Sequence, residues 1–476
     1  MPTNLSIEQE EQRRWTPHPK YARVNWFDKM VTREFASPDE QSAWESLALR
    51  QIVRFAVNNV PYYRDLFKRL GLKAGDIRSA GDLPLLPLLT RRDVQDNVST
   101  LRAARLPPGQ KFDGFTKTSG STGEPVIVAQ TKLSNWMFPL LAQRHMRWAR
   151  FDPAGSLGSI RPARDLPRLP GGQHVGPGDL CRHRSWPMTG IYFETGPFSG
   201  FSNANPLDSQ VEWVEREQPN YLLMQSGDME HLALGFQERP PLDSLRGFQA
   251  ISQQLTPEMR RRIERTFGVP VHENYGLNEF GIVALHCPEG ERYHVNTELC
   301  LVEIVDEEGQ PCRAGEKGRI VVTTLTNAAM PLLRYDADDL AEAVEGPCPC
   351  GRTLPSFGAI HGRYRRIAMV PPEALQYWHV LHEALTDMPP DISKPLRQYQ
   401  LHQFSDGRFE LRLVVAGTLS AGFVEWIESA WRTTGAPADQ LTIREVDEIP
   451  RPPSGKFQDM TSDFLRSPKF KSDDSG

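Results

Sequence analysis

The feature that most restricts how this chain can fold is a loop of small and hydroxyl-bearing residues at 118–125, with the sequence TSGSTGEP. The stretch 112–130 around it is typical of a strand, a glycine-rich loop and a second strand. Its two glycines let the backbone approach a ligand closely, and its hydroxyl and backbone N–H groups suit a phosphate chain. The loop is not a Walker A motif, which requires Gly-x-x-x-x-Gly-Lys-Ser/Thr. On its own such a loop is more often a plain turn, so its meaning depends on the rest of the chain.

The spacing of apolar residues elsewhere predicts both helices and β-hairpins, which indicates a mixed α/β chain. Ser37, Pro38 and Glu40 are placed as an N-cap, a first helical residue and a capping-box partner, and apolar residues then repeat at helical spacing almost to Pro61. Period-two alternation predicts a hairpin that starts at 294. Further predicted elements are helices over 256–267 and 423–431, strands over 269–271 and 441–446, a second hairpin over 398–416, and a long loop rich in Pro and Gly over 153–180.

The composition excludes several classes of protein. The 476 residues carry a net charge of −5, so nothing favours a nucleic-acid partner. Hydrophobic residues make up 39%, enough for a large core, and no apolar run approaches the ~20 residues that span a bilayer. The N-terminal residues lack a signal-peptide pattern, and six cysteines in so long a chain do not make a disulfide scaffold. We therefore expect a cytoplasmic protein of two or three domains without a membrane or nucleic-acid partner.

Four further segments follow the loop in a fixed order. They are YGLNE at 275–279, TTLTNAAMPLLRYDADDL at 323–340, His361-Gly362-Arg363 and Ser454-Gly455-Lys456. Together with the loop they resemble the motifs of the superfamily of adenylate-forming enzymes. Within that superfamily the chain resembles the phenylacetate–coenzyme A ligase family. The resemblance extends to NVPYYR at 59–64 and LPLLPLLTRRDV at 83–94, and it covers most of residues 40–365.

This resemblance implies both a fold and a reaction. The fold is α/β, with a large N-terminal ATP- and acyl-binding domain over 1–362 that includes β-hairpins, and a small mobile α+β domain over 363–476. In the reaction, the carboxylate of an acid attacks the α-phosphate of ATP and releases pyrophosphate. The acyl-adenylate then passes its acyl group to a second nucleophile. Such chemistry depends mainly on positioning and on stabilising charge at phosphorus.

The resemblance also implies a role for each motif. Tyr275 stacks on adenine, Glu279 holds Mg²⁺ between the phosphates, and Asp339 accepts hydrogen bonds from both ribose hydroxyls. Arg363 contacts the ribose or a phosphate near the hinge between the domains, and Lys456 bridges the attacking carboxylate and the α-phosphate. We regard Lys456 and Glu279 as the catalytic pair. The loop residues that hold the β- and γ-phosphates are Ser119, Gly120, Ser121, Thr122 and Gly123.

The sequence departs from the family pattern around the phosphates. Glu124 stands where the loop commonly has a lysine, so one cation directed at the phosphates is missing. Asn278 replaces the usual Thr or Ser before Glu279, although an amide can still donate to a phosphate oxygen. Residues 252–254 replace a frequent Gly-Glu pair.

The largest departure concerns the second half-reaction. Family members carry a glycine-bearing loop after Arg363 that swings in for thioester formation, whereas residues 363–406 contain no glycine and include Pro371-Pro372. A loop of this composition cannot adopt the same positive-φ geometry. Coenzyme A remains the first candidate acceptor, and an amine or a carrier protein is the alternative. A nucleotide-binding protein without catalysis is a third hypothesis, against which Lys456 argues.

Cysteines and a histidine suggest a structural zinc site. Cys287, His294, Cys348 and Cys350 make a set of three thiolates and one imidazole, which suits tetrahedral Zn²⁺. Some relatives of the family carry a similar set. His286 is the alternative histidine, and the competing interpretation is a group of free thiols beside a surface histidine. The other cysteines are read as ordinary thiols: Cys181, Cys300 and Cys312.

The substrate is a carboxylic acid whose identity the sequence leaves open. The family default is an aryl or arylacetic acid, and we expect Gly281, Ile282 and the loop at 153–200 to shape its pocket. The basic residues of that loop are Arg161, Arg164, Arg182 and Arg184. They hold an anionic group of the substrate or are solvated charges, and the second reading is the commoner one. A homodimer is an open alternative for the quaternary state.

Overall fold

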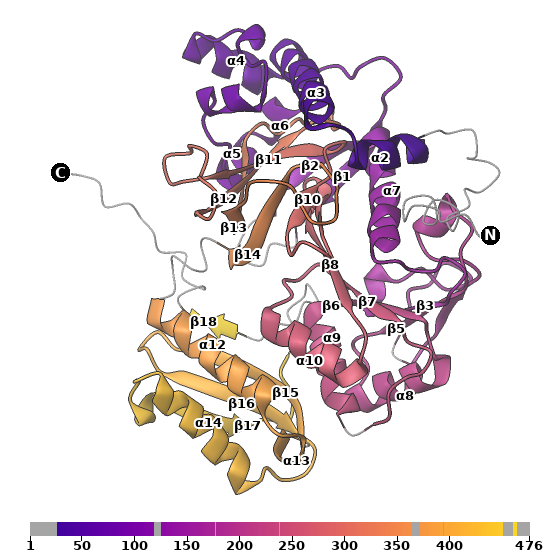
Figure 1. Cartoon of the computed structure of the whole chain (residues 1–476), viewed down its shortest axis with the longest axis vertical. Helices are drawn as coiled ribbons and strands as arrows, with labels where there is room; N and C mark the ends of the chain where they lie inside the picture. The colour runs from indigo at the N-terminus through magenta and orange to yellow at the C-terminus, as the bar shows by residue number, and fades with distance from the viewer. Residues whose placement is uncertain are drawn as a thin grey trace. The chain divides into compact units, whose positions relative to one another are not determined.

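The computed structural model describes residues 26–118, 125–176, 178–237, 239–363, 372–393, 395–450 and 460–463 (Figure 1). Contacts group the chain into two compact units. The first unit comprises Met1–Ser156, His183–Pro197 and His272–Tyr364, and the second comprises Leu157–Arg182, Phe198–Val271 and Arg365–Gly476. The predicted boundary between a large N-terminal domain and a small mobile domain, at 362/363, stays a prediction.

The helices of the first unit begin at strong capping signals. Ser37 caps α3 (Pro38–Asn59) in a complete capping box with Glu40, as predicted, and Pro61 starts the next helix, α4 (Pro61–Leu70). The remaining helices of this unit are α2 (Trp26–Glu34), α5 (Arg91–Asp96), α6 (Val98–Leu101) and α7 (Lys132–Trp148), with the 3₁₀ turns η1 (Ala74–Asp76), η2 (Ala80–Leu85) and η4 (Thr189–Ile191). Among the described residues, no helix is both long and apolar enough to cross a membrane.

Two groups of strands complete the first unit. The strands β1 (Phe112–Lys117) and β2 (Ile127–Thr131) pair antiparallel on either side of the predicted loop. The other strands are β8 (Val271–Leu277), β9 (Gly281–His286), β10 (Tyr293–Val295), β11 (Cys300–Val305), β12 (Lys317–Thr324), β13 (Tyr335–Ala343) and β14 (Ser356–Arg363). They neighbour one another in the order β11-β12-β13-β14-β10-β9-β8. The antiparallel pair β11–β12 confirms the predicted hairpin. The strand predicted at 269–271 begins only at Val271 and continues to Leu277.

The second unit contains a parallel sheet that corrects one prediction. Its strands β3 (Leu157–Arg161), β5 (Phe198–Ser202), β6 (Tyr221–Gln225) and β7 (Gly247–Ile251) lie in the order β7-β6-β3-β5, followed by β4 (Cys181–His183). The predicted long loop at 153–180 is therefore wrong over β3 and over the 3₁₀ turn η3 (Ala163–Asp165). Because β3 pairs with β5 and β6 and is almost completely buried, it lacks the alternation that marks a half-exposed strand. Three helices contribute to the buried core of this sheet: α8 (Leu207–Glu217), α9 (Ser226–Phe236) and α10 (Pro257–Phe267), the last as predicted.

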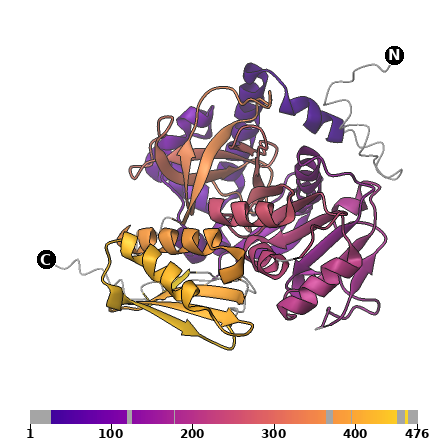
Figure 2. The ribbon, with the colours of Figure 1, turned by 60° about the horizontal axis from the view of Figure 1, so that its bottom comes forward.

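The C-terminal part of the second unit is a four-stranded sheet with helices. The strands β15 (Leu396–Gln403), β16 (Phe409–Val415), β17 (Leu441–Glu445) and β18 (Met460–Ser462) lie in the order β17-β16-β15-β18. The helices are α12 (Pro372–Asp387), α13 (Pro390–Ser393) and α14 (Ala421–Thr433), with the 3₁₀ turn η5 (Ala438–Gln440). Figure 2 shows α12 and α14 over the same face of this sheet, and their apolar side chains form its core. The predicted hairpin turns at Gly407, whose φ of +87° favours glycine.

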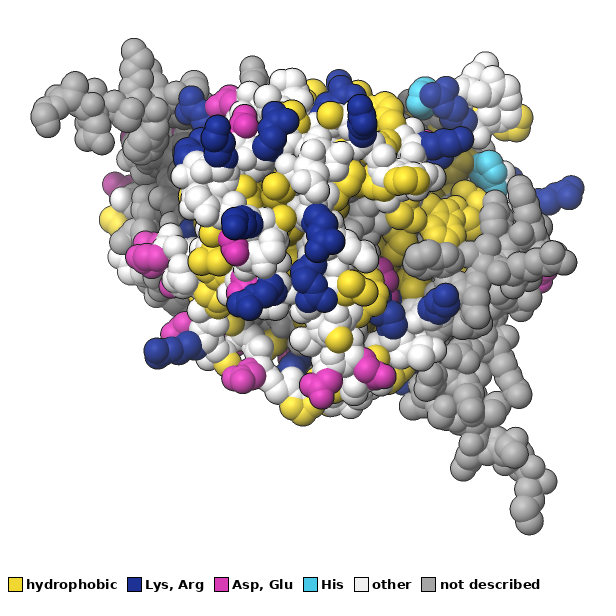
Figure 3. Space-filling model, turned by 90° about the horizontal axis from the view of Figure 1, so that it is seen from above, with side chains coloured by type: hydrophobic (Ala, Val, Ile, Leu, Met, Phe, Trp, Pro, Cys, Tyr) yellow, Lys and Arg dark blue, Asp and Glu magenta, His cyan; other side chains and the backbone are white. Residues whose placement is uncertain are grey.

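This architecture confirms the predicted mixed α/β fold. On the face seen in Figure 3, Lys and Arg side chains are dispersed among hydrophobic and acidic ones.

Candidate nucleotide and metal sites

Two residues of the predicted nucleotide site lie in direct contact in the first unit. The Tyr275 hydroxyl, on β8, donates to Asp339 Oδ2 on β13 at 2.7 Å. Asp339 pairs in the strand register with Arg363, the last residue of β14. The pairing of β13 with β14 places the Arg363 backbone beside the Asp339 backbone, and the Tyr275 hydroxyl reaches the Asp339 side chain. Three residues that lie far apart in the sequence are therefore close together.

The predicted Mg²⁺ ligand is held in the same way. Glu279 lies in the turn after β8 and is only 7% exposed, and its Oε1 accepts from the Tyr335 hydroxyl at 2.7 Å. Gln130 donates to the Glu279 backbone carbonyl at 3.1 Å, which ties this turn to β2. Burial and the Glu279 carboxylate raise the pKa of Tyr335 above its ordinary value, so its hydroxyl stays protonated and remains a donor. A carboxylate oriented by one hydroxyl still offers lone pairs to a cation.

Sequence reasoning missed a cation beside the phosphate loop. Arg91, in the first turn of α5, donates to Thr118 Oγ1 at 3.0 Å, immediately before the loop. Leu89 pairs with the backbone on both sides of Tyr335, because its N–H donates to Arg334 and its carbonyl accepts from Asp336. The Arg91 charge acts to lower the pKa of Tyr335, although burial and Glu279 outweigh it. The stretch 83–94 contributes to the family resemblance, but nothing in its sequence assigns a role to Arg91.

Other predicted nucleotide-site residues lie outside the described residues. They are the loop residues Ser119, Gly120, Ser121, Thr122 and Gly123, and the predicted catalytic Lys456. The described residues on either side of the loop pair with each other: the Thr118 N–H donates to the Val126 carbonyl, and the Val126 N–H donates to Thr118 Oγ1 at 2.9 Å. Thr118, which also accepts from Arg91, is the last described residue before the loop.

The four predicted metal ligands converge. Cys287 follows β9, His294 lies on β10, and Cys348 and Cys350 belong to the turn between β13 and β14. One ligand atom from each residue lies within 4.8 Å of all the others. The Cys287 and Cys348 sulfurs are 3.7 Å apart, and Cys350 Sγ is 3.4 Å from His294 Nε2. Sulfurs bound to one tetrahedral zinc at about 2.3 Å lie about 3.8 Å apart, so the spacing suits that ion.

The surroundings of the Cys/His centre, as we call these four residues, also favour a metal. His294 Nδ1 donates to the Leu354 carbonyl at 3.0 Å, which leaves Nε2 with a lone pair directed at the cluster. A Cβ at Gly290 would lie 2.3 Å from Cys348 Sγ, so only glycine fits beside this thiol. The alternative ligand His286 is not part of the cluster and packs its ring edge-on against Tyr293 at 5.1 Å.

The residues predicted to shape the acyl pocket and the arginines predicted in the loop at 153–200 contact different neighbours. Gly281 has a φ of +97°, and a Cβ there would approach the half-exposed Phe138 ring to 3.5 Å. Arg164 lies 3.7 Å from Asp165, and Arg182 pairs with Glu217 at 2.7 Å. These two acid contacts agree with the solvated-charge reading of the arginines. Ile282 is buried on β9, Arg161 is partly buried on β3, and Arg184 is exposed.

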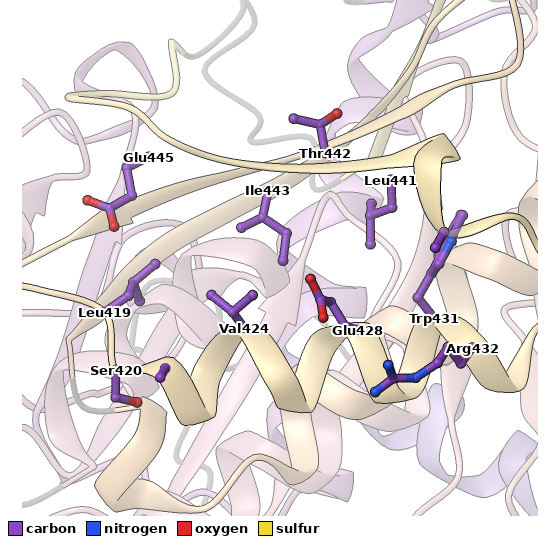
Figure 4. Close-up of a pocket in the computed structure, with 12 residues that line it drawn as sticks. Leu419, Ser420, Val424, Glu428, Trp431, Arg432, Leu441, Thr442, Ile443 and Glu445 are labelled. Carbon is purple, nitrogen blue, oxygen red and sulfur yellow. The ribbon is translucent and has the colours of Figure 1, made fainter.

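A separate pocket of about 580 Å³ lies between α14 and β17 in the C-terminal sheet (Figure 4). Val424, Leu441 and Ile443 point into it, and Glu428 and Arg432 lie beside them. Its lining includes none of the described residues that the sequence predicted for nucleotide or metal binding. It is therefore distinct from both candidate sites.

Comparison with known proteins finds similarity to the same superfamily that the sequence motifs resemble. Residues 189–330 match the family of AMP-binding enzymes. The chain is 28% identical to phenylacetate–coenzyme A ligase of Thermus thermophilus over 322 residues, which covers 66% of this chain and 68% of the relative. It is also 28% identical to the enzyme of that name from Escherichia coli over 345 residues, or 70% and 74% of the two chains.

A solved structure supports the same fold. 2-Hydroxyisobutyryl-CoA ligase in the postadenylation state aligns with a TM-score of 0.67 at 17% identity, over 90% of this chain and 91% of that chain. At this identity the likeness shows the fold alone. This fold agrees with the family match and the sequence relatives. The chain belongs to the superfamily of adenylate-forming enzymes, groups there with the phenylacetate–coenzyme A ligase family, and is an AMP-forming acid ligase.

Proposed function

We propose that this protein activates a carboxylic acid as its acyl-adenylate and then transfers the acyl group to coenzyme A. The observation that carries the proposal is the pair of oriented carboxylates in the first unit. Asp339 is held by Tyr275, and Glu279 is held by Tyr335, each through a hydroxyl at 2.7 Å. A carboxylate can accept several hydrogen bonds, so one tyrosine hydroxyl does not exhaust either group, and both residues belong to the sequence segments that resemble the family motifs.

In the first half-reaction these residues bind and orient ATP. Asp339 accepts from the ribose hydroxyls, and Tyr275 lies against the adenine. Glu279 would hold Mg²⁺, which neutralises charge on the phosphates. Residues 119–123 donate backbone and hydroxyl hydrogen bonds to the β- and γ-phosphates. The Lys456 ammonium stabilises the charge that develops as the substrate carboxylate attacks the α-phosphate and pyrophosphate leaves.

Arg91 supplies the cation that the loop itself lacks. Glu124 occupies the usual lysine position, whereas the Arg91 guanidinium contacts Thr118 from the neighbouring helix. A guanidinium at this place can donate to terminal phosphate oxygens and to the departing pyrophosphate. We therefore include Arg91 among the phosphate-binding residues.

The acceptor is coenzyme A and the acid is aromatic or arylacetic. The two sequence relatives described above are phenylacetate–coenzyme A ligases, which favours coenzyme A over an amine or a carrier protein. Phe138 lies next to Gly281, a residue of the predicted acyl pocket, and an aromatic side chain at this place suits an aryl group. The alternative of an amine or carrier acceptor arose from the absence of glycine after Arg363, and residues 364–371 of that stretch lie outside the described residues.

The Cys/His centre binds a structural Zn²⁺ in this proposal. Its four donors leave no open position for substrate, which separates it from catalytic zinc. Binding would join the turn at 348–350 to β10 and to the end of β9. Elemental analysis of the purified protein should find about one zinc per chain. A chain without tightly held metal would refute this assignment.

Pyrophosphate exchange tests the proposed reaction. Labelled pyrophosphate should enter ATP in the presence of phenylacetate or a benzoate, and to a lesser extent with aliphatic acids. Single-turnover reactions should then show that coenzyme A discharges the adenylate faster than hydroxylamine or simple amines. Absence of exchange across the acid panel would refute adenylation, and preference for amines would refute the assignment of the acceptor.

A further inference from the structure

The Cys/His centre is linked to helix α2 through one buried carboxylate. Glu34, at the end of α2, has no exposed surface. Its oxygens accept from Trp148 Nε1 at 2.9 Å and lie 3.0 Å from Arg144 Nε. Arg147 also donates to Glu34, and Arg352 Nε approaches it at 3.4 Å. Three arginines and a tryptophan therefore converge on a residue near the beginning of the described chain.

Two of these groups also contact the metal ligands. The Arg352 backbone N–H donates to Cys350 Sγ at 3.4 Å, and its guanidinium lies 4.2 Å above the Trp148 ring. The Trp148 ring meets His294 edge-on at 5.7 Å between centroids. Arg352 and Trp148 are thus in contact with Glu34 on one side and with Cys350 and His294 on the other.

The chain just beyond the centre also binds the end of α2 directly. The Thr353 backbone N–H donates to the Glu34 carbonyl at 2.9 Å, and Thr353 Oγ1 donates to the Ala36 carbonyl at 2.5 Å. A ligand that holds residues 350–353 in place therefore also holds residues 34–36 in place through these hydrogen bonds.

The charged side chains around Glu34 carry a net positive charge, which favours a negatively charged metal centre beside them. The group consists of four arginines and two glutamates, Arg33, Arg144, Arg147, Arg352, Glu34 and Glu298. Their formal charges sum to about +2, which becomes about +1 when Glu45, which interacts with Arg33 and Glu298, is ionised. Three thiolates and one Zn²⁺ carry a net charge of about −1. A loaded centre would therefore place negative charge beside Arg352.

We propose that the metal-loaded Cys/His centre acts as a clasp for the N-terminal helix α2. Metal at Cys350 and His294 holds Arg352 and Trp148 in the positions from which they bind Glu34. Loss of the metal frees the turn at 348–353 and with it residues 26–36. The inference rests on the proposed zinc site, and its test separates the two.

Limited proteolysis of the full-length protein can test this clasp. Lys29 is an exposed trypsin site within α2, and Arg444 is an exposed site on β17 in the other unit. Removing the metal with a chelator should raise the cleavage rate at Lys29 at least tenfold and leave cleavage at Arg444 unchanged. Restoring Zn²⁺ should restore protection at Lys29.

Two variants sharpen this test. Arg352→Gln should retain zinc by elemental analysis yet expose Lys29 as chelation does. Arg150→Gln is the matched control, because Arg150 pairs with Glu289 near the centre but is largely exposed, and it should leave Lys29 protected.

The outcomes distinguish the clasp from the metal site. A protein that binds zinc but shows no change at Lys29 on chelation would overturn the clasp and leave the zinc assignment intact. Equal acceleration at Lys29 and Arg444 would also overturn it, because the metal would then stabilise the whole fold. A protein purified without zinc would overturn both.

Discussion

The nucleotide site and the Cys/His centre are built on neighbouring strands of the first unit, yet their polar groups are satisfied in opposite ways. Glu279 and Asp339 each accept from a tyrosine hydroxyl at 2.7 Å, and a carboxylate can accept several hydrogen bonds at once. The four metal ligands instead face one another within 4.8 Å, and a metal would use all of their donor atoms. The first arrangement suits ligands that come and go, and the second suits one that stays.

This difference predicts which property each site controls. Changes at an open site remove interactions with the bound substrate and should alter rates with little effect on folding. Changes at a closed centre remove links between parts of the fold and should alter stability with little effect on turnover. The following predictions test that separation, beginning with the largest expected effect.

Lys456→Ala should lower the rate of adenylate formation by at least about 1,000-fold and leave ATP affinity and the melting temperature nearly unchanged. The lysine acts on charge that develops only in the transition state, so its loss affects the rate more than binding. Pyrophosphate exchange, calorimetric titration with ATP and thermal unfolding measure the three quantities. Lys471→Ala, in the C-terminal tail, is the control. Adenylation at the rate of the unmodified enzyme would remove Lys456 from the site.

Cys348→Ser should show the opposite pattern. We expect loss of most bound zinc and a fall in melting temperature of about 5 °C or more, because one ligand of a closed centre is gone. Pyrophosphate exchange at 25 °C should stay within about twofold. Cys312→Ser removes a partly exposed thiol outside the centre and should change neither quantity. An equal loss of activity in Cys348→Ser would break the separation between the two sites.

The pH dependence of the free energy of unfolding tests one buried histidine next to the strand that carries Tyr275. His145, on α7, is buried, and burial followed by the charges of His272 and His286 lowers its pKa to about 3. Asn274, on the strand that also carries Tyr275, contacts its Nδ1 at 3.3 Å. The unfolded chain binds this proton near the ordinary pKa of about 6.5, so the native state binds fewer protons between about 3 and 6.5. The stability contributed by His145 is complete above pH ~6.5 and is lost as the pH falls toward 3.

Denaturant unfolding should therefore show a fall of up to about 1.4 kcal/mol per pH unit below pH ~6.5 from this group. His145→Asn should flatten that slope, whereas His174→Asn, at an exposed position, should not. The adenylation rate of folded His145→Asn at pH 7.5 should stay near that of the unmodified enzyme. An unchanged slope in His145→Asn would show that other groups carry the acid sensitivity.

Local patterns in the sequence predicted much of the fold. The cap at Ser37 and the turn at Gly407 depend on neighbours three or four residues away, so they are visible in the sequence. The strand β3 was missed because pairing on both sides buries nearly all of it, and its alternation disappears among prolines and glycines. That burial is a property of the assembled sheet, which no short window contains.

The same distinction applies to the sites. Tyr275, Asp339 and the four metal ligands could be predicted because each belongs to a motif with a chemical signature. Arg91 and Glu34 could not, since their roles arise from partners 27 and 318 residues away, Thr118 and Arg352. An arginine or glutamate in a helix has no such signature and is usually a solvated charge.

Asp339→Ala should raise the KM for ATP by about 10- to 100-fold, because hydrogen bonds to a charged acceptor are worth about 1.5–3 kcal/mol. The melting temperature should change by no more than about 2 °C. Asp336→Ala is a matched control on the same strand, since Asp336 pairs with Arg319 and should leave the KM for ATP unchanged. If Asp339→Ala instead unfolds the protein, its carboxylate serves the fold, and the contrast with the Cys/His centre fails at this position.

The smallest predicted effect concerns Arg91, which lies at the edge of the open site. Arg91→Gln should lower adenylation by about 5- to 10-fold, a modest loss because a half-exposed guanidinium is partly screened by water and salt. Arg91→Lys should recover part of the rate, since it retains the charge but loses the planar donors. Arg92→Gln, one residue later and exposed, should have no effect. Because Glu124 already places a negative charge in the loop, Glu124→Lys in the Arg91→Gln background should restore adenylation if the two positions supply the same phosphate cation. Failure of that rescue, with Arg91→Lys also inactive, would mean that Arg91 acts by holding Thr118 through its hydrogen bond and not by binding phosphate.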